Sequence, residues 1–405
     1  MSYEKVSLGS CCEVVSGATP KTGIPEYWDG DVLWATPKDL GDLEGKFIRD
    51  TPRKITQAGL QSCAASILPI GSVLLSSRAP IGHVAINAQP MATNQGFKSL
   101  VPKPGKIDAG YLYHWLRGNR SFLQSLGNGA TFKEVSKSVV EQIRIPLPPM
   151  EEQQRIAQAL DQVNALRDQR RQAVTILDAL IQSIFLDMFG DVVSNDRNWP
   201  VGTVAKLVRE FQSGKSFAAT EEDPETVKYR ILKVSAVTTG KFMPEESKAV
   251  PASYIPPESH FVREGDLLFS RANTEALIGA VALVSETPNN LILPDKIWRF
   301  VWHAGNVANR YYVRQLFRQE KFRREIGRRA TGTSGSMKNI SQEKVLGIPC
   351  ALVPTDLQNR YGERVAAVEK LKAEHLRHLA ALDSLFASIQ YRAFRGELWA
   401  DASAA

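Results

Sequence analysis

The sequence predicts an α+β protein in which two similar globular domains alternate with two long helices that pair as an antiparallel coiled coil. Three observations lead to this fold class. The run from 150 to 189 contains neither Gly nor Pro, the chain repeats itself about 200 residues later, and the remaining parts alternate short apolar runs with turns. A chain of 405 residues also exceeds the usual size of a single hydrophobic core.

Residues 1–148 form the first predicted domain. Strand-like runs bounded by Gly, Pro and Asp recur through it, namely CCEVVSG, VLWAT, SVLLSS, HVAINA and IRIPLP. Only 111–126 has a helical pattern, so a mixed domain is expected.

A single long helix is predicted over 149–190. Pro149 stands at its start, and Glu151 and Glu152 occupy the first turn, where the helix dipole favours negative charge. A helix of some forty residues is a rod of roughly 60 Å. Helices of that length usually need a partner helix.

The second half of the chain repeats this order. A second domain is predicted over 191–353, with a helix at about 308–327, followed by a second long helix over 354–397 and a tail over 398–405. LDALIQSIFLDMFGD, which starts at Leu177, aligns with LDSLFASIQYRAFRG, which starts at Leu382, and six of the fifteen pairs are identical. We interpret the chain as one duplicated module with approximate two-fold symmetry.

Heptad-like spacing predicts the seam through which the long helices pack. The predicted seam residues are Val163, Leu166, Leu177, Leu180 and Ile184 in the first helix and Val368, Leu371, Leu382, Leu385 and Ile389 in the second. Arg170 and His375 interrupt it at equivalent positions, either as polar residues that set the register or as solvated residues at the edge.

Matching loops carry the candidate functional residues. SSRAPIG and SRANTEALIG each place an arginine after a buried strand, which aligns Arg78 with Arg271 and Gly82 with Gly279. TNQGFKSL aligns with PDKIWRFV, and TFKEVS with SMKNIS. Cations, amides and hydroxyls in turns are suited to contacts with phosphates and bases. The DNA-binding candidates are Arg78, Asn94, Gln95, Lys98, Thr131, Lys133, Arg271, Asn273, Lys296, Arg299, Ser336 and Lys338. The alternative is that an arginine pairs with a carboxylate at the domain edge.

Composition agrees with a polyanionic partner, since the net charge is +7 and the pI is near 9.1. The four cysteines have no spacing typical of a zinc site or of disulfides, and no signal or membrane-spanning segment is expected, which indicates a reduced, cytoplasmic protein. The motifs of nucleotide loops, dinucleotide folds, zinc proteases and serine hydrolases are absent; SGKS at 213–216 lacks the first glycine of a phosphate loop. Neither a catalytic residue nor a bound metal is predicted.

The layout resembles the specificity (S) subunit of type I restriction-modification systems. The resemblance covers essentially the whole chain and depends on IPLPPMEEQQRI before the first long helix, its diverged echo IPCALVPTDLQNRY, and the closing FRGEL. It implies two target recognition domains that read the halves of a bipartite, asymmetric DNA site, separated by several unspecified base pairs. It also implies that the helices act as a ruler and dock two modification (M) subunits, which would carry S-adenosylmethionine, with restriction subunits as further partners.

Two other functional classes remain open. One is a DNA-processing enzyme with an unrecognised site, which binding of S-adenosylmethionine or DNA cleavage by the isolated chain would reveal. The other is a coiled-coil scaffold that binds only protein, which would show no DNA binding.

Overall fold

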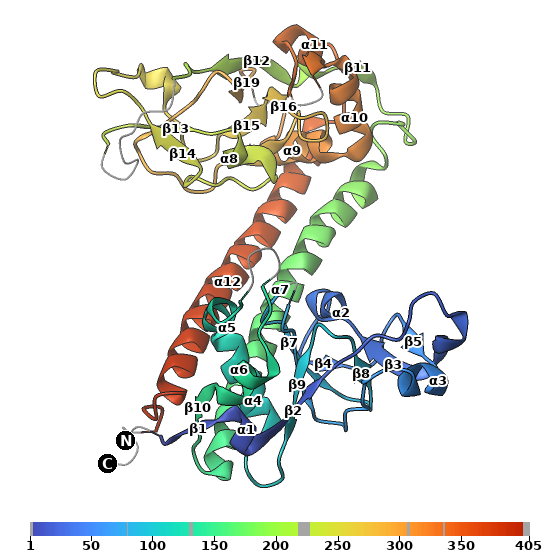
Figure 1. Ribbon diagram of the computed structural model, residues 1–405. Coiled ribbons are helices and arrows are strands. Elements are labelled where there is room, and N and C mark those ends of the chain that lie inside the picture. The colour runs from blue at the N-terminus through green and yellow to red at the C-terminus, as the bar shows by residue number, and fades with distance from the viewer. Residues whose placement is uncertain are drawn as a thin grey trace. The chain divides into compact units, whose positions relative to one another are not determined.

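The computed structural model describes residues 3–78, 80–128, 133–217, 227–305, 308–334 and 337–399. The chain forms two compact units (Figure 1). The first unit contains Met1–Arg171 and Leu376–Ala405, and the second contains Gln172–His375. The divisions fall inside both long helices, so each unit is a globular domain together with part of each helix.

Among the residues that the structure describes, the first unit contains ten strands and seven short helices, of which η1 is a 3-10 helix, besides its parts of the two long helices. Its strands are β1 (Lys5–Ser7), β2 (Cys12–Ser16), β3 (Trp28–Ala35), β4 (Phe47–Ile48), β5 (Lys54–Ile55), β6 (Val73–Leu75), β7 (Val84–Asn87), β8 (Ala92–Thr93), β9 (Lys98–Pro102) and β10 (Arg144–Pro146). Its short helices are α1 (Leu8–Cys11), η1 (Pro25–Tyr27), α2 (Pro37–Gly41), α3 (Gln57–Gln61), α4 (Ala109–Gly118), α5 (Arg120–Ser125) and α6 (Lys137–Gln142).

The second unit has the same kinds of element. Its strands are β11 (Val201–Thr203), β12 (Val208–Ser213), β13 (Arg230–Leu232), β14 (Ser247–Ala249), β15 (Leu267–Ser270), β16 (Ala272–Asn273), β17 (Val281–Leu283), β18 (Leu291–Ile292), β19 (Ile297–Trp302), β20 (Thr331–Ser334), β21 (Met337–Asn339) and β22 (Pro349–Ala351). Its short helices are η2 (Val204–Lys206), α8 (Ser235–Thr238), η3 (Glu258–His260), α9 (Arg310–Arg318), α10 (Glu320–Arg329) and α11 (Gln342–Leu346).

Strand order confirms the internal repeat. The main sheet of the first unit runs β2-β9-β6-β7-β4, and that of the second runs β12-β19-β15-β17. A smaller sheet accompanies each, β5-β3-β8 and β14-β13-β18, with one antiparallel and one parallel pairing in both. The helices predicted at 111–126 and 308–327 are each two helices, because the backbone leaves helical geometry at Asn119 and Gln319.

The long helices are α7 (Met150–Phe189) and α12 (Thr355–Ala393), shown in green and orange-red in Figure 1. Gly190 ends α7 with a φ of 70°, and its N–H donates to the carbonyl of Leu186. A side chain at this position would clash with Asp196, since a Cβ would lie 2.1 Å from its Oδ1. A glycine is therefore required at this C-terminal cap.

The two long helices run antiparallel within each unit. In the first unit, Arg167 of α7 forms an ion pair with Asp383 of α12 at 2.6 Å. In the second unit, Lys372 of α12 pairs with Asp178 of α7. Adding 205 converts 167 to 372 and 178 to 383, so these are the two copies of one interaction, which is what a two-fold repeat requires.

The seam prediction is wrong at four leucines. Leu166, Leu180, Leu371 and Leu385 are 41–47% exposed. The covered positions are Val163, Arg167, Arg170, Val174, Leu177, Ile181 and Ile184 in α7, and their equivalents Val368, Lys372, His375, Leu379, Leu382, Phe386 and Ile389 in α12. These positions also alternate steps of three and four residues. Polar residues occupy two of the seven positions in each helix, so a search for apolar spacing alone assigned the wrong heptad phase to the seam. Arg170 and His375 do lie on this seam.

A buried glutamine ties the start of each long helix to its own domain. Gln153 Oε1 accepts a hydrogen bond from the backbone N–H of Asp108 at 2.8 Å, and Gln358 Oε1 accepts one from Asn309 at 2.9 Å. Both side chains are no more than 1% exposed. The start of the second long helix therefore keeps this glutamine, although most of the residues around it differ.

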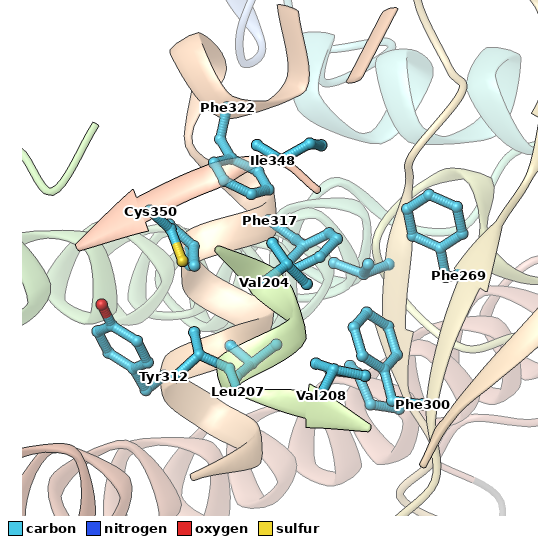
Figure 2. Packing of buried hydrophobic residues seen from close by; sticks show 14 of the residues in the cluster. Val204, Leu207, Val208, Phe269, Phe300, Tyr312, Phe317, Phe322, Ile348 and Cys350 are labelled. Atoms are coloured by element: carbon cyan, nitrogen blue, oxygen red, sulfur yellow. The ribbon is translucent and has the colours of Figure 1, made fainter. Parts of the chain in front are cut away.

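Aromatic side chains fill the core of the second unit. Figure 2 shows Phe317 from α9 facing Phe269 from β15 and Phe300 from β19, with ring centroids 5.9 and 5.1 Å apart. Val204, Leu207 and Val208 close the cluster beside Tyr312, as the same figure shows. This packing fixes α9 against the sheet and so positions the strand ends described below.

A buried polar cluster joins α4 to α7 in the first unit. His114 Nε2 lies 2.7 Å from Asp161, which also accepts a hydrogen bond from Lys46 at 2.7 Å. Burial lowers the pKa of His114, and the smaller effect of Asp161 opposes it. Burial alone would raise the pKa of Asp161, but the hydrogen bonds from His114 and Lys46 together lower it.

We expect this cluster to make the first unit sensitive to acid. Because the folded-state pKa of His114 lies below its unfolded value of about 6.5, its contribution is complete above that pH and is lost as the pH falls below it. His114→Gln should reduce the loss of stability between about pH 7.5 and 5.5. Amide hydrogen exchange in peptides of the first unit measures this; equal losses in variant and wild type would contradict it.

One 18-residue window of α7 has a mean hydropathy of 1.4, which by length and composition alone would allow a membrane span. Within the second unit, however, Ile181, Phe185 and Phe189 of this helix are buried in the aromatic core. Packing against the domain therefore accounts for these apolar residues.

Candidate nucleic-acid interface

Backbone hydrogen bonds bring three separate segments together where interior strands of each main sheet end, at β6 and β9 in the first unit and at β15 and β19 in the second. In the first unit, the N–H of Ser77 donates to the carbonyl of Gly96, and the N–H of Val135 donates to the carbonyl of Ser77. In the second unit, the N–H of Arg271 donates to the carbonyl of Lys296, and the N–H of Ile340 donates to the carbonyl of Arg271. All four distances are 2.8–3.1 Å. We call these two groups of joined segments, around Ser77 and around Arg271, the first and second loop edges.

These hydrogen bonds correct the alignment of the two arginines. The N–H of Gly82 donates to the carbonyl of Ser76, and the N–H of Gly279 donates to the carbonyl of Ser270. The predicted match of the two glycines is therefore confirmed, and the two serines are equivalent positions. Counting from them, Arg271 corresponds to Ser77, and Arg78 lies one residue further along. The extra serine in SSRAPIG caused the shift. The two arginines therefore occupy different positions of the repeated turn.

At the first loop edge, Glu134 holds two of the predicted cations. Its carboxylate lies 3.1 Å from Lys98 Nζ and 3.8 Å from Arg78. Lys98 is 8% exposed, whereas about a third of the Arg78 side chain is accessible. Lys98 thus fits the alternative of an internal ion pair, and Arg78 keeps a face toward solvent.

At the second loop edge, Arg271 lies against Asp295. Its Nε donates to the Asp295 carbonyl at 2.9 Å, its guanidinium is 3.9 Å from the carboxylate, and it lies 5.6 Å from the Trp298 ring centre. Lys338 is 3.9 Å from Glu275. These contacts orient the cations and leave them partly accessible.

Arg299 is the candidate most fully satisfied inside its domain. It forms an ion pair with Asp266 at 3.0 Å, and donates to the carbonyls of Phe261 and Ser259 and to Gln212. Its side chain is 12% exposed. This geometry favours a structural role in holding β19 to its neighbours over a contact with DNA.

The remaining candidates vary in their surroundings. Asn94 accepts a hydrogen bond from the N–H of Gly96 and shapes that turn, while Gln95 is exposed and bonded to Thr19. Asn273 donates to Thr238 and pairs with Lys338 across the β16–β21 ladder. Lys133 is exposed and Lys296 half-buried. Thr131 and Ser336 lie outside the described residues.

Sequence reasoning missed the carboxylates that orient the cations. Glu134 directly follows Lys133 in the TFKEVS loop, and Asp295 stands in the PDKIWRFV segment, so both lay inside the aligned motifs. Among residues the structure describes, no group of three or more His, Cys, Asp or Glu side chains could hold a metal ion. The chemistry these edges offer is hydrogen bonding and charge.

Comparison with known proteins agrees with this architecture. The sequence profile described as "Type I restriction modification DNA specificity domain" matches residues 2–175. The specificity subunit of the type I restriction enzyme MjaVIII from Methanocaldococcus jannaschii is 23% identical over 386 residues, which cover 91% of this chain and 86% of the relative. The first 175 residues thus match the specificity-domain profile, and nearly the whole chain is similar to a type I specificity subunit.

Other type I specificity subunits are also similar to the chain. The MjaIX specificity subunit from M. jannaschii is 34% identical over 245 residues, but the alignment spans only 56% of each chain. The EcoKI specificity subunit from Escherichia coli K12 is 27% identical over 345 residues, or 80% of this chain and 73% of that one.

A solved structure confirms the fold. The crystal structure of a type I restriction-modification S subunit from M. genitalium covers 97% of this chain and 96% of its own, with a TM-score of 0.60 at 13% identity. This structural likeness confirms the predicted fold class.

Proposed function

We propose that this specificity subunit recognises a bipartite DNA sequence, one half through each loop edge, for a type I restriction-modification complex. The observation that carries the proposal is the repeated hydrogen-bond frame of the two loop edges, which holds different side chains in the two copies. Ser77 in one copy and Arg271 in the other occupy the same backbone position. A shared frame with different side chains suits the reading of two different sequences in the same manner.

Mapping of methylated adenines tests the proposal. The chain would be reconstituted with its modification subunits and S-adenosylmethionine, and modified genomic DNA would be sequenced. We expect methylation at one asymmetric site of two specified parts. Methyl transfer or DNA cleavage by the isolated chain would favour an enzyme instead, and the absence of any DNA binding would favour a protein scaffold.

Arg78 and Arg271 are the cations at the loop edges whose removal should be most informative. If either reads a guanine by two hydrogen bonds, Arg→Ala should cost about 1–3 kcal/mol of binding free energy and relax one position of the site. If it holds phosphate, binding to all sequences should weaken and the salt slope should fall by about one. Arg144→Ala is the matched control, since Arg144 is exposed on β10 and its side chain donates to the Lys5 carbonyl. Unchanged affinity would remove the residue from the interface.

The exposed leucines support docking of two modification subunits. Each exposed leucine precedes a seam residue by one position. Within the first unit Leu166 and Leu385 therefore flank one edge of the helix pair, and within the second unit Leu180 and Leu371 do the same. The ion pairs of Asp178 and Asp383 belong to the opposite edge. S-adenosylmethionine would be held by these partners, restriction subunits would join the complex, and the assembly would act in the cytoplasm.

Leu180→Asp should therefore weaken association with modification subunits by about tenfold or more, since burial of a leucine contributes about 1.5–3 kcal/mol. Ala179→Asp is the control, because it places the same residue on another exposed face of the same helix. Titration of labelled modification subunit measures both variants. Equal affinities for the two variants would exclude this edge as the docking surface.

A further inference from the structure

A cationic cleft of about 740 Å³ adjoins the loop edge in the first unit. It opens between the turn before β7, the helices α4 and α5, and α7. Its cationic lining residues are Lys46, Arg117, Arg120, Arg167 and Arg171, against the carboxylates of Asp161 and Asp168. The lining therefore carries an excess of positive charge.

A second cleft of about 570 Å³ lies in the second unit, between the turn before β17 and the helices α9 and α10. Its charged lining residues are Arg318, Arg323, Arg324, Arg328, Glu275 and Glu320. Here too the arginines outnumber the carboxylates.

The two clefts occupy equivalent places in the repeat. Asp108 and Asn309 cap α4 and α9, and the backbone N–H of each donates a hydrogen bond to the equivalent glutamine of a long helix. Counting nine residues from each cap reaches Arg117 and Arg318, which line the two clefts. The turns on the other side of the clefts also correspond, as the matched bonds of Gly82 and Gly279 establish.

The arginines of the second cleft are close to one another and incompletely neutralised. Burial, and then the charge of Arg314, lower the pKa of Arg318. Burial, and then Arg318, lower the pKa of Arg323. Within the described part of the chain, Arg318 has no carboxylate within 4 Å, and Arg323 donates to the carbonyl of Ala276. An anion in the cleft would relieve this repulsion.

Each cleft lies beside its loop edge. In the first unit, a Cβ on Gly127 would lie 2.7 Å from Ile81 and 3.2 Å from Lys133, so the loop that carries Lys133 packs on the turn of the cleft. In the second unit, Glu275 lines the cleft and pairs with Lys338 of the loop edge. A ligand along the loop edge would therefore extend to the cleft.

We propose that the two clefts bind DNA phosphates next to each half-site, with Arg117 and Arg318 as equivalent, sequence-independent anchors. This inference rests on the proposed function. The loops of the two copies differ, so they suit different bases. A cationic feature kept at the same place in both copies must serve what both half-sites share, which is the sugar-phosphate backbone.

The test uses the complex assembled with modification subunits and two unmethylated DNA duplexes of equal length. One duplex has a random sequence, and the other carries the recognition site identified by methylation mapping. Arg117→Gln and Arg318→Gln should each weaken binding to both duplexes about three- to tenfold and reduce the salt slope by about one. Arg318→Lys, which keeps the charge, should retain the slope. The matched controls are Arg144→Gln and Arg209→Gln, which alter exposed arginines outside the clefts and should change neither quantity.

Several outcomes would overturn the inference. If the variants assemble normally and their DNA affinity and salt slope are unchanged, the clefts do not contact DNA. A changed preference at one base pair with normal binding to random DNA would make the arginine a base reader. Failure to assemble, with the melting of the free chain unchanged, would make the cleft a protein interface. If the wild-type complex itself does not prefer the duplex with the recognition site over the random duplex, the proposed function is wrong. In that case, the effect of the variants on binding to the random duplex still shows whether Arg117 and Arg318 bind phosphates.

Discussion

Lengthening both long helices by four residues is expected to widen the gap between the two half-sites by about two base pairs and to leave both half-sites unchanged. The insertions would follow Arg170 and His375, which are equivalent seam positions. Four residues add about 6 Å of helix, and one base pair spans about 3.4 Å of duplex. Seven inserted residues, which keep the heptad phase, add about 10.5 Å and should widen the gap by about three base pairs.

Methylation maps of the wild type and both insertion variants measure this series. A four-residue insertion after Gly105 is the control, because this exposed turn has open space around it and lies outside the helices. The control should leave the gap unchanged. If the half-sites changed while the gap stayed the same in the helix variants, the helices would not set the spacing.

Phe189→Ala is expected to destabilise the second unit by about 3–5 kcal/mol, the cost typical of removing a buried aromatic side chain. Phe189 is fully buried, and its ring centre lies 5.1–5.4 Å from those of Phe185, Tyr312 and Tyr361. These residues come from α7, α9 and α12, so the cavity would loosen the joint between the domain and both long helices.

Peptide-resolved hydrogen exchange of the free chain measures this effect, since the two units need not unfold together. Leu186→Ala is the matched control: it lies one turn earlier on the same helix, is 43% exposed, and should change stability by no more than about 0.5 kcal/mol. Loss of protection should be confined to the second unit. Equal effects of the two variants would contradict the role of the aromatic joint.

The sequence predicted the features that repetition reveals and missed those that depend on contacts. The long helices and the duplicated domains were visible because Leu177 and Leu382 begin nearly matching runs. The seam phase was misassigned because Arg167 and Lys372 occupy covered positions through ion pairs, which a search for apolar residues passes over. Partners from distant segments, as with Glu134 for Arg78, only become evident once the strands are paired.

The division of the chain into units also bears on the order in which it folds during synthesis. The second unit is one continuous segment, Gln172–His375, whereas the first combines Met1–Arg171 with Leu376–Ala405. Domains generally fold as they leave the ribosome, N-terminal ones first. Here the N-terminal domain must wait for the last part of α12, which supplies Asp383 for Arg167 and Phe386 for the core. The first unit, which is synthesised first, is thus completed last. A chain truncated before Leu376 would contain the whole second unit but only part of the first.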